Sequence, residues 1–309
     1  MNNIYNFYSH GKLLITGEYL VLLGAKALAI PVKFGQSLRV SEIPELSTLV
    51  WNARERGKTW FTAELSINEL KIISSSDYEI ASRLQYLLRS CRDLNSKFLK
   101  VAVQVDTDTN FPRLWGLGTS STLTANMAAW AEIDPFQLHW KVSQGSGYDI
   151  ACAASSSPII YQVAGGIPSV KHIAFSPPFV DHLCFVYLDK KQDSAKSLDD
   201  FIHNDNSPKD AIRQISEITE TISKAMDFSL FIKLLDRHET ILSAILRQPT
   251  VKQTLFPDFP GVVKSLGAWG GDFVMAASLS SENDVVAYFN SQGFRTILKY
   301  SEMVYSLAS

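Results

Sequence analysis

The sequence predicts an α+β protein built from two domains. The chain has 309 residues, too many for one small hydrophobic core on the usual length prior. Hydrophobic residues make up 46% of the chain and charged residues 19%, an ordinary globular composition. Strand-like and helix-like stretches alternate, and clusters of glycine and proline separate them.

The first third of the chain contains mostly strand signals. Residues 4–40 are typical of strands joined by glycine turns, and residues 41–75 alternate weakly, as in a meander. Between Tyr78 and Leu94 the apolar positions follow a helical period. Residues 98–106 alternate at every second position, which predicts a strand.

Two loops in the middle of the chain each precede a helix. The loop at residues 112–121 leads into an Ala-rich helix, and the loop at 143–147 leads into a short one. An apolar strand follows at residues 158–163.

Glycines and prolines at residues 165–168 and 177–178 mark the expected domain boundary. We therefore predict an N-terminal domain over residues 1–175 and a C-terminal α/β sandwich over 176–309. The C-terminal elements are expected at 182–188 (strand), 208–226 and 228–247 (helices), 273–278 (strand), 282–292 (helix) and 294–299 (strand).

Net charge and the N-terminus exclude several classes of function. A net charge of −2 gives no basic field for nucleic acid or an anionic membrane, so neither is an expected partner. The N-terminus lacks a charged region and a cleavage site, and no apolar run is long enough to span a bilayer. We expect a cytoplasmic protein whose cysteines, Cys91, Cys152 and Cys184, are reduced thiols.

The loop at residues 112–121 has the chemistry of a phosphate site. Gly116 and Gly118 let the backbone approach a phosphate, and a helix start offers unpaired amides and a positive dipole end. The hydroxyls of residues 119–121 cap the helix, bind phosphate or reach magnesium. Taken alone, this segment is more often an ordinary capped helix start.

Four segments in order resemble the motifs of the GHMP kinases. They are residues 11–19 (GKLLITGEY), 112–120 (PRLWGLGTS), 145–151 (GSGYDIA) and 264–272 (KSLGAWGGD). The third is similar to the motif that names the GYDIA subgroup. The resemblance implies a ribosomal protein S5 domain 2-like N-terminal domain and a ferredoxin-like C-terminal domain, on the mevalonate kinase and phosphomevalonate kinase side of the superfamily.

The resemblance also implies roles for individual residues, with ATP as co-substrate and Mg²⁺ as cofactor. Asp149 faces the acceptor oxygen, Lys12 approaches that aspartate and the transferred phosphate, and Ser120 reaches the metal. Phosphates are held at Gly116, Leu117, Gly118, Thr119, Ser120 and Ser121. Supporting positions are Glu18, Gly147, Gly267, Ala268, Gly270 and Gly271.

The sequence departs from the family pattern at three positions. His10 replaces a proline, Trp115 a small residue and Trp269 a glycine. Three interpretations of the two indoles remain open. They pack together in the core, they change the mode of nucleotide binding, or they block the site. Residues 136–141 offer no carboxylate for magnesium, which leaves Ser120, phosphates and water, with Asp134 or Glu132 as substitutes.

The acceptor is expected to be phosphomevalonate or mevalonate, a small anionic or hydroxyl-bearing molecule. Another GHMP kinase for a sugar or amino-acid alcohol, a related decarboxylase and a non-catalytic nucleotide-binding relative remain open. The chain is expected to act as a monomer or homodimer. Basic candidates for an anionic acceptor are Arg113, Lys141, Lys190, Lys191 and Lys196.

Overall fold

The computed structural model describes residues 3–190 and 208–305 and has an α+β architecture with two sheets. Contacts divide the chain into two compact units. Unit 1 contains residues 1–11, 34–113 and 117–154, and unit 2 contains 12–33, 114–116 and 155–309. The α+β prediction is confirmed, whereas the boundary at residues 175/176 stays a prediction.

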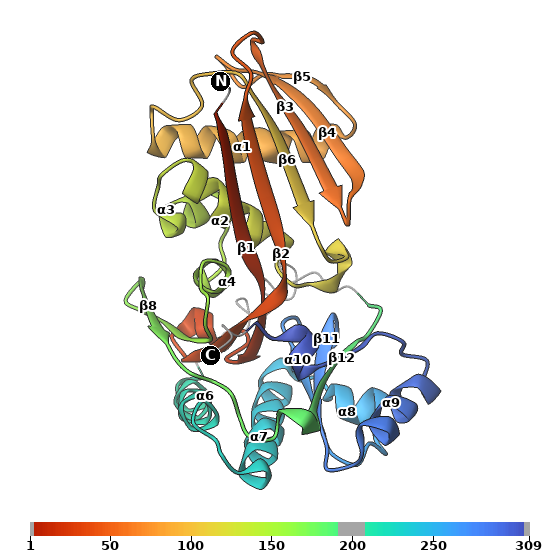
Figure 1. The fold of residues 1–309 in the computed structure, drawn as a ribbon. Coiled ribbons are helices and arrows are strands. Elements are labelled where there is room, and N and C mark those ends of the chain that lie inside the picture. Colours follow the sequence, from red (N-terminus) through yellow and green to blue (C-terminus); the bar gives the residue numbers. More distant parts are fainter. Residues whose placement is uncertain (1–2, 191–207, 306–309) are drawn as a thin grey trace. The chain divides into compact units, whose positions relative to one another are not determined.

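A twisted sheet forms the framework of unit 1 (Figure 1). Its strand order is β5-β4-β3-β6-β2, with β1 on β2, and only β3 and β6 run parallel among the pairs that carry a register. The predicted meander is therefore present. The strands are β1 (Ile4–Thr16), β2 (Ala27–Glu42), β3 (Thr48–Glu55), β4 (Lys58–Ser66), β5 (Ile72–Ser75) and β6 (Val103–Thr109).

Helices pack on this sheet and enclose the core of unit 1. The core joins alternate strand residues such as Leu49, Trp51 and Val105 to the apolar stripe of the first helix, which includes Leu84 and Leu88. The helices are α1 (Tyr78–Leu94), α2 (Thr119–Trp130), α3 (Pro135–Val142) and α4 (Tyr148–Ala153). The predicted helix over residues 78–94 is confirmed.

Two local predictions in unit 1 need correction. The strand expected at residues 98–106 begins only at Val103, because Leu99 adopts a positive φ of 57° that no strand permits. Phe98 and Leu99 are nevertheless buried, so their apolar character reflects packing of a turn. Helix α3 was not predicted, although Asp134 followed by Pro135 is a typical helix start.

Unit 2 contains a hairpin, which pairs in antiparallel fashion with Ala27–Ala29 of β2, and a small antiparallel sheet. The hairpin of β7 (Ile159–Ala164) and β8 (Ile167–His172) turns at Gly165 and Gly166, with φ of 59° and 78°. Two of the expected boundary markers thus form a hairpin turn, and β8 is a strand that the sequence does not predict. The small sheet has the order β10-β11-β9-β12, formed by β9 (Leu183–Tyr187), β10 (Val262–Leu266), β11 (Phe273–Ala277) and β12 (Ile297–Lys299).

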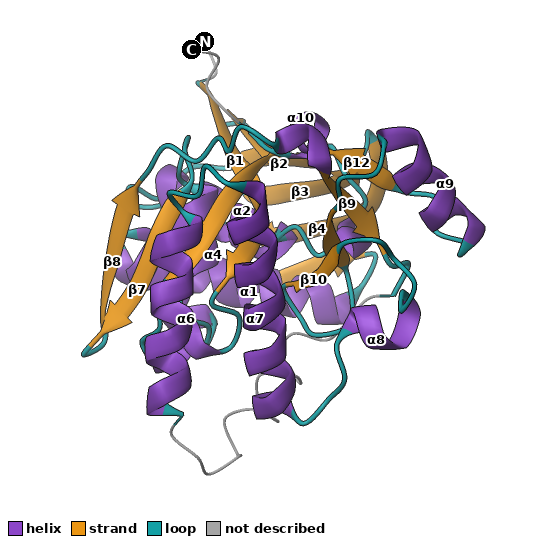
Figure 2. Ribbon diagram, turned by 90° about the horizontal axis from the view of Figure 1, so that it is seen from below, coloured by secondary structure: helices purple, strands orange, loops and turns teal. Residues whose placement is uncertain are grey.

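Helices α6 and α7 lie side by side in unit 2 (Figure 2). Strand β10 and helices α8 and α10 were not predicted, whereas α6, α7 and α9 were. The helices of unit 2 are α6 (Lys209–Ile222), α7 (Phe228–Leu246), α8 (Val251–Leu255), α9 (Glu282–Ser291) and α10 (Tyr300–Met303). Short 3₁₀ helices are η1 (Leu20–Leu23), η2 (Arg113–Trp115) and η3 (Val180–His182).

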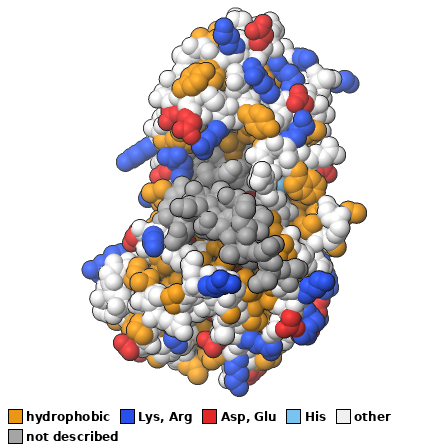
Figure 3. All heavy atoms as spheres, turned by 180° about the vertical axis from the view of Figure 1, so that it is seen from behind, with side chains coloured by type: hydrophobic (Ala, Val, Ile, Leu, Met, Phe, Trp, Pro, Cys, Tyr) orange, Lys and Arg blue, Asp and Glu red, His pale blue; other side chains and the backbone are white. Residues whose placement is uncertain are grey.

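Positive and negative side chains intermingle on the face shown in Figure 3. Within residues 3–190 and 208–305, no helix combines the length and hydropathy needed to cross a bilayer.

The turn after β1 depends on a glycine. Gly17 has φ of 96°, and a Cβ there would lie 2.6 Å from the Ala27 Cβ and 2.8 Å from its Cα. We expect Gly17→Ala to destabilise the protein by about 1–3 kcal/mol from the clash, beyond about 1–2 kcal/mol for the left-handed backbone. Gly57→Ala is the control, because Gly57 also has positive φ, 77°, but nothing within 4 Å. Equal losses of unfolding free energy in denaturant titrations would contradict the clash.

Candidate functional site

The start of α2 in unit 1 is shaped for an anion. Its N-cap is Gly118, with φ of 92°, and no side chain caps the helix. The first three amides of a helix have no partner within it, so those of residues 119–121 point toward whatever lies before the helix. Such a start, with its positive dipole end, binds phosphate.

The hydroxyls at this helix start differ in what they do. Ser121 is buried and donates to the Gly118 carbonyl oxygen at 2.8 Å, which ties the loop to the first turn. Thr122 donates to Gln36 Oε1 at 2.8 Å. Ser120 is exposed, and Thr119 is half-buried. Among residues 119–121, Ser120 is therefore the most exposed.

A second helix start in unit 1 carries the predicted catalytic carboxyl group. Helix α4 packs against α2, and its N-cap Gly147 has φ of 87°. Asp149 lies in the first turn, is half-buried and accepts from the Ile150 amide at 3.0 Å. His139 Nε2 lies 3.2 Å from the Gly145 carbonyl oxygen and holds the preceding loop. The structure thus joins residues 117–121 and Asp149 in one unit, on two adjoining helices.

Buried polar contacts fix α2 to the sheet. Asn126 accepts from the Ser9 hydroxyl at 2.8 Å and donates to the Gln36 carbonyl oxygen at 2.9 Å. These side chains are at most 5% exposed, so each bond also satisfies a group that would be costly to bury unpaired. The helix start is therefore set by contacts with both β1 and β2.

Gly116 lies in unit 2, between contacts from two other motifs. The Lys12 ammonium donates to its carbonyl oxygen at 3.2 Å. On the Cα side, a Cβ at Gly116 would lie 2.2 Å from Asp272 Oδ2, so only glycine fits. Gly116 has φ of 68° and Asp272 has φ of 51°. Unit 2 therefore brings together Lys12, Gly116 and the third glycine motif.

The two tryptophans have separate partners in unit 2. Trp115 packs edge-on against Phe273 with ring centroids 5.6 Å apart, and against Tyr187 at 6.2 Å. The Tyr187 hydroxyl donates to the Leu114 carbonyl oxygen at 3.1 Å. Trp269 is 8% exposed, and its indole N–H donates to Pro249 at 3.1 Å. Each indole is thus held by its own set of contacts.

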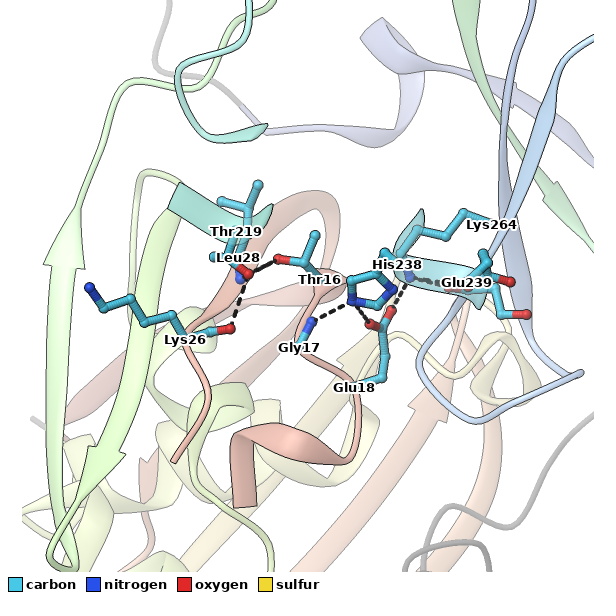
Figure 4. Close-up of polar contacts among 10 residues, drawn as sticks. Thr16, Gly17, Glu18, Lys26, Leu28, Thr219, His238, Glu239 and Lys264 are labelled. Atoms are coloured by element: carbon cyan, nitrogen blue, oxygen red, sulfur yellow. Dashed lines mark hydrogen bonds and ion pairs between the residues drawn. The ribbon is translucent and has the colours of Figure 1, made fainter. Parts of the chain in front are cut away.

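Glu18 belongs to a buried charged cluster in unit 2 (Figure 4). The lysine cluster, as we name it, contains Glu18, His238, Glu239 and Lys264, each at most 3% exposed. Lys264 Nζ donates to Glu18 Oε1 at 2.6 Å and lies 3.7 Å from Glu239 Oε1. His238 Nε2 accepts from the Gly17 amide at 3.0 Å and lies 3.3 Å from Glu18 Oε2.

Burial changes the pKa values of this cluster. It raises the pKa of Glu18, against the opposing charge of Lys264. It raises the pKa of Glu239 to about 7, again opposed by Lys264 and reinforced by Glu18. Burial and then the Lys264 charge lower the pKa of His238 well below its usual value, which agrees with an Nε2 that accepts a hydrogen bond. One ammonium thus serves two carboxyl groups.

The predicted site residues fall into two groups. Unit 1 holds residues 117–121, Gly147 and Asp149, and unit 2 holds Gly116 with the remaining positions. In unit 2 these are Lys12, Glu18, Gly267, Ala268, Gly270 and Gly271. The roles of all these residues stay predictions.

Other candidates have structural partners. Arg113 pairs with Glu55 and stacks on Trp60, and Lys141 pairs with Asp93. Lys191 and Lys196 lie outside the described residues.

Asp134 Oδ1 caps α3 by accepting from two backbone amides, at 2.8 and 3.0 Å. Glu132 lies in the turn after α2 with φ of 53°. Sequence reasoning misses His238, Glu239 and Lys264, although a lysine within the otherwise apolar strand β10 is an available signal.

Comparisons with known proteins identify the fold. No family model and no curated protein matches the sequence. The structure is similar to L. major mevalonate kinase in complex with R-mevalonate, with a TM-score of 0.71 and 14% identity over 100% of this chain and 98% of that chain. It is similar to Streptococcus pneumoniae phosphomevalonate kinase in complex with phosphomevalonate and AMPPNP, with a TM-score of 0.71 and 15% identity over 96% and 99% of the chains.

Galactokinase from Lactococcus lactis, complexed with galactose, has a TM-score of 0.66 and 10% identity over 98% of this chain and 95% of that chain. The chain therefore has the fold that these kinases share.

The lysine cluster predicts a pH-dependent stability. The native pKa of Glu239, about 7, exceeds the unfolded value of 4.5, so its contribution is complete below pH 4.5 and is lost as pH rises through 7. The difference corresponds to roughly 3 kcal/mol. We expect Glu239→Gln to flatten the fall in unfolding free energy between pH 5 and 8, measured by urea titration. Glu79→Gln, an exposed member of an ion pair with Arg83, is the control and should keep the wild-type slope. Parallel curves for Glu239→Gln and wild type would refute the assignment.

Proposed function

We propose that this chain is a GHMP-type kinase that transfers the γ-phosphoryl group of ATP to phosphomevalonate or mevalonate. The motifs in residues 11–19, 112–120, 145–151 and 264–272 support this function. So does a fold shared with kinases whose structures contain R-mevalonate, phosphomevalonate or galactose. We extend the proposal to a cytoplasmic enzyme that uses ATP as its co-substrate.

The observation that carries the proposal is the pair of adjoining helix starts in unit 1. Both helices begin at a glycine of positive φ without a side-chain cap, and one of them carries Asp149. Phosphoryl transfer needs alignment and charge stabilisation more than covalent help from the protein. Backbone amides at one helix start and a carboxylate at the next supply both requirements.

The proposed roles follow from this chemistry. The amides of residues 119–121 bind the phosphates, and Asp149 takes the proton of an acceptor hydroxyl as the new P–O bond forms. Lys12 offsets charge on the phosphoryl oxygens. Gly267, Ala268, Gly270 and Gly271 contribute backbone contacts.

The residues present fit a magnesium ion that keeps most of its water. The exposed Ser120 hydroxyl at the helix start would hold it together with phosphate oxygens. Asp134 is a poorer candidate, since one of its oxygens already caps α3. When bound, Mg²⁺ neutralises charge on the β- and γ-phosphate oxygens.

An acceptor panel tests the function. We expect ADP formation from ATP and Mg²⁺ with phosphomevalonate or mevalonate, and none with galactose or homoserine. Turnover of a sugar or an amino-acid alcohol would replace the acceptor, and release of carbon dioxide from mevalonate diphosphate would identify a decarboxylase. No turnover, combined with no nucleotide binding in calorimetry, would overturn the proposal. Nucleotide binding without turnover would favour a non-catalytic relative.

Asp149→Asn separates the two acceptors. A hydroxyl acceptor depends on a base, whereas a phosphate acceptor is already ionised. We expect kcat on mevalonate to fall by about 10²–10⁴-fold and kcat on phosphomevalonate to fall less. Asp93→Asn, which changes only a surface ion pair with Lys141, should leave both rates unchanged. A greater loss with phosphomevalonate would contradict the role of Asp149.

A further inference from the structure

A lysine with no exposed surface is an unusual component of a small sheet. Lys264 lies on β10, where all five residues are buried. Removing an ammonium from water costs several kcal/mol, and an apolar side chain of similar volume would fill the same space more favourably. The lysine cluster therefore adds something that packing alone does not require.

One end of the ion pair lies in the first motif. Glu18 is part of the turn at residues 17–19, which follows β1 directly. Gly17 donates its amide to His238 on α7, and Thr16 shares a hydrogen bond of 2.7 Å with Thr219 on α6 (Figure 4). These contacts hold the end of the strand that carries Lys12.

The other end lies at the third motif. Lys264 lies on β10, which ends directly before Gly267. Its ammonium also donates to the Ser265 carbonyl oxygen at 2.7 Å. The Tyr19 hydroxyl accepts from the Trp269 amide at 2.7 Å. The turn at 17–19 thus contacts the motif at 264–272 twice, through an ion pair and through a hydrogen bond.

The two contacts between the turn and the third motif also affect Gly116, which is contacted from both sides. Lys12, from the strand before the turn, binds the carbonyl oxygen of Gly116, and Asp272, from the end of the third motif, lies against its Cα. A change in the spacing between turn and motif would therefore displace one contact relative to the other.

We propose that Lys264 and Glu18 are positioning residues for the phosphoryl transfer, an inference that rests on the proposed function. Their ion pair fixes the spacing between the turn at 17–19 and the motif at 264–272. This spacing determines where Lys12 and the loop ending at Gly116 lie. Neither side chain needs to touch a substrate for this role.

The experiment compares Lys264→Met with the double variant Glu18→Gln/Lys264→Met. The single variant leaves Glu18 as an unpaired buried carboxylate and should lose stability, whereas the double variant removes both charges of the pair. Burial raises the pKa of the remaining Glu239, which without the Lys264 charge stays neutral, so the double variant should regain the lost stability. We expect the double variant to melt near the wild-type temperature and still show a 10- to 100-fold lower kcat. Its affinity for Mg-ATP, by calorimetry, should change less than threefold, because the α2 amides are untouched.

Hydrogen exchange gives a readout that needs no turnover. The Trp269 amide should exchange at least tenfold faster in the double variant, while the amide of Val105 in the core of unit 1 stays protected. Glu239→Gln is the matched control, since Glu239 is as deeply buried beside Lys264 but belongs to α7. It should leave both the exchange rate and kcat unchanged.

Wild-type kcat in the stable double variant, or unchanged Trp269 exchange, would overturn the inference and reduce the pair to a folding element. The same holds if Glu239→Gln lowers kcat as much as the double variant. Lack of turnover by the wild-type protein with every acceptor counts against the kinase function instead. The exchange experiment then still decides whether the ion pair fixes the third motif.

Discussion

The ammonium of Lys264 is the strongest constraint within unit 2. A cation without access to water must lie against carboxylate or carbonyl oxygens, and it can reach them only if their elements come to it. Glu18 arrives from the turn after β1 and Glu239 from α7. The positions of three elements are therefore coupled to one charge. The same turn and strand belong to two of the glycine motifs. The buried ion pair therefore also determines the positions of the motif loops.

Unit 1 satisfies a different constraint at its helix starts. Ser, Thr, Asp and Asn are the preferred N-caps because their side chains satisfy an orphan amide, and α1 and α3 use aspartates in this way. At α2 and α4 the cap is glycine instead, at a φ that other residues avoid. Side-chain capping is thus absent at the two helix starts that, in the proposed function, supply the phosphate-binding amides and the Asp149 carboxyl group.

Local signals were enough to predict most elements and the loops of the site. The stripe at residues 78–94 gave α1 with its observed bounds, and the loops before α2 and α4 were placed correctly. Tertiary contacts account for the failures. Phe98 and Leu99 are apolar because a turn is buried there, and β10 contains a lysine whose carboxyl partners, Glu18 and Glu239, belong to the turn after β1 and to α7. No single sequence shows which distant partner will neutralise a buried charge.

The tryptophans that interrupt the glycine motifs are compatible with the backbone those motifs require. A positive φ favours glycine, as at Gly267 and Gly270, with φ of 78° and 75°. Trp269 is not among the positive-φ residues of the described chain, so a side chain is allowed there. Trp115 lies in η2, and the left-handed residue that follows it is Gly116. The two substitutions thus fall at positions where the motif needs no glycine. The Trp115 indole packs on Phe273, and the Trp269 indole donates to the Pro249 carbonyl oxygen. These contacts stabilise the two loops in the conformation that the remaining glycines permit.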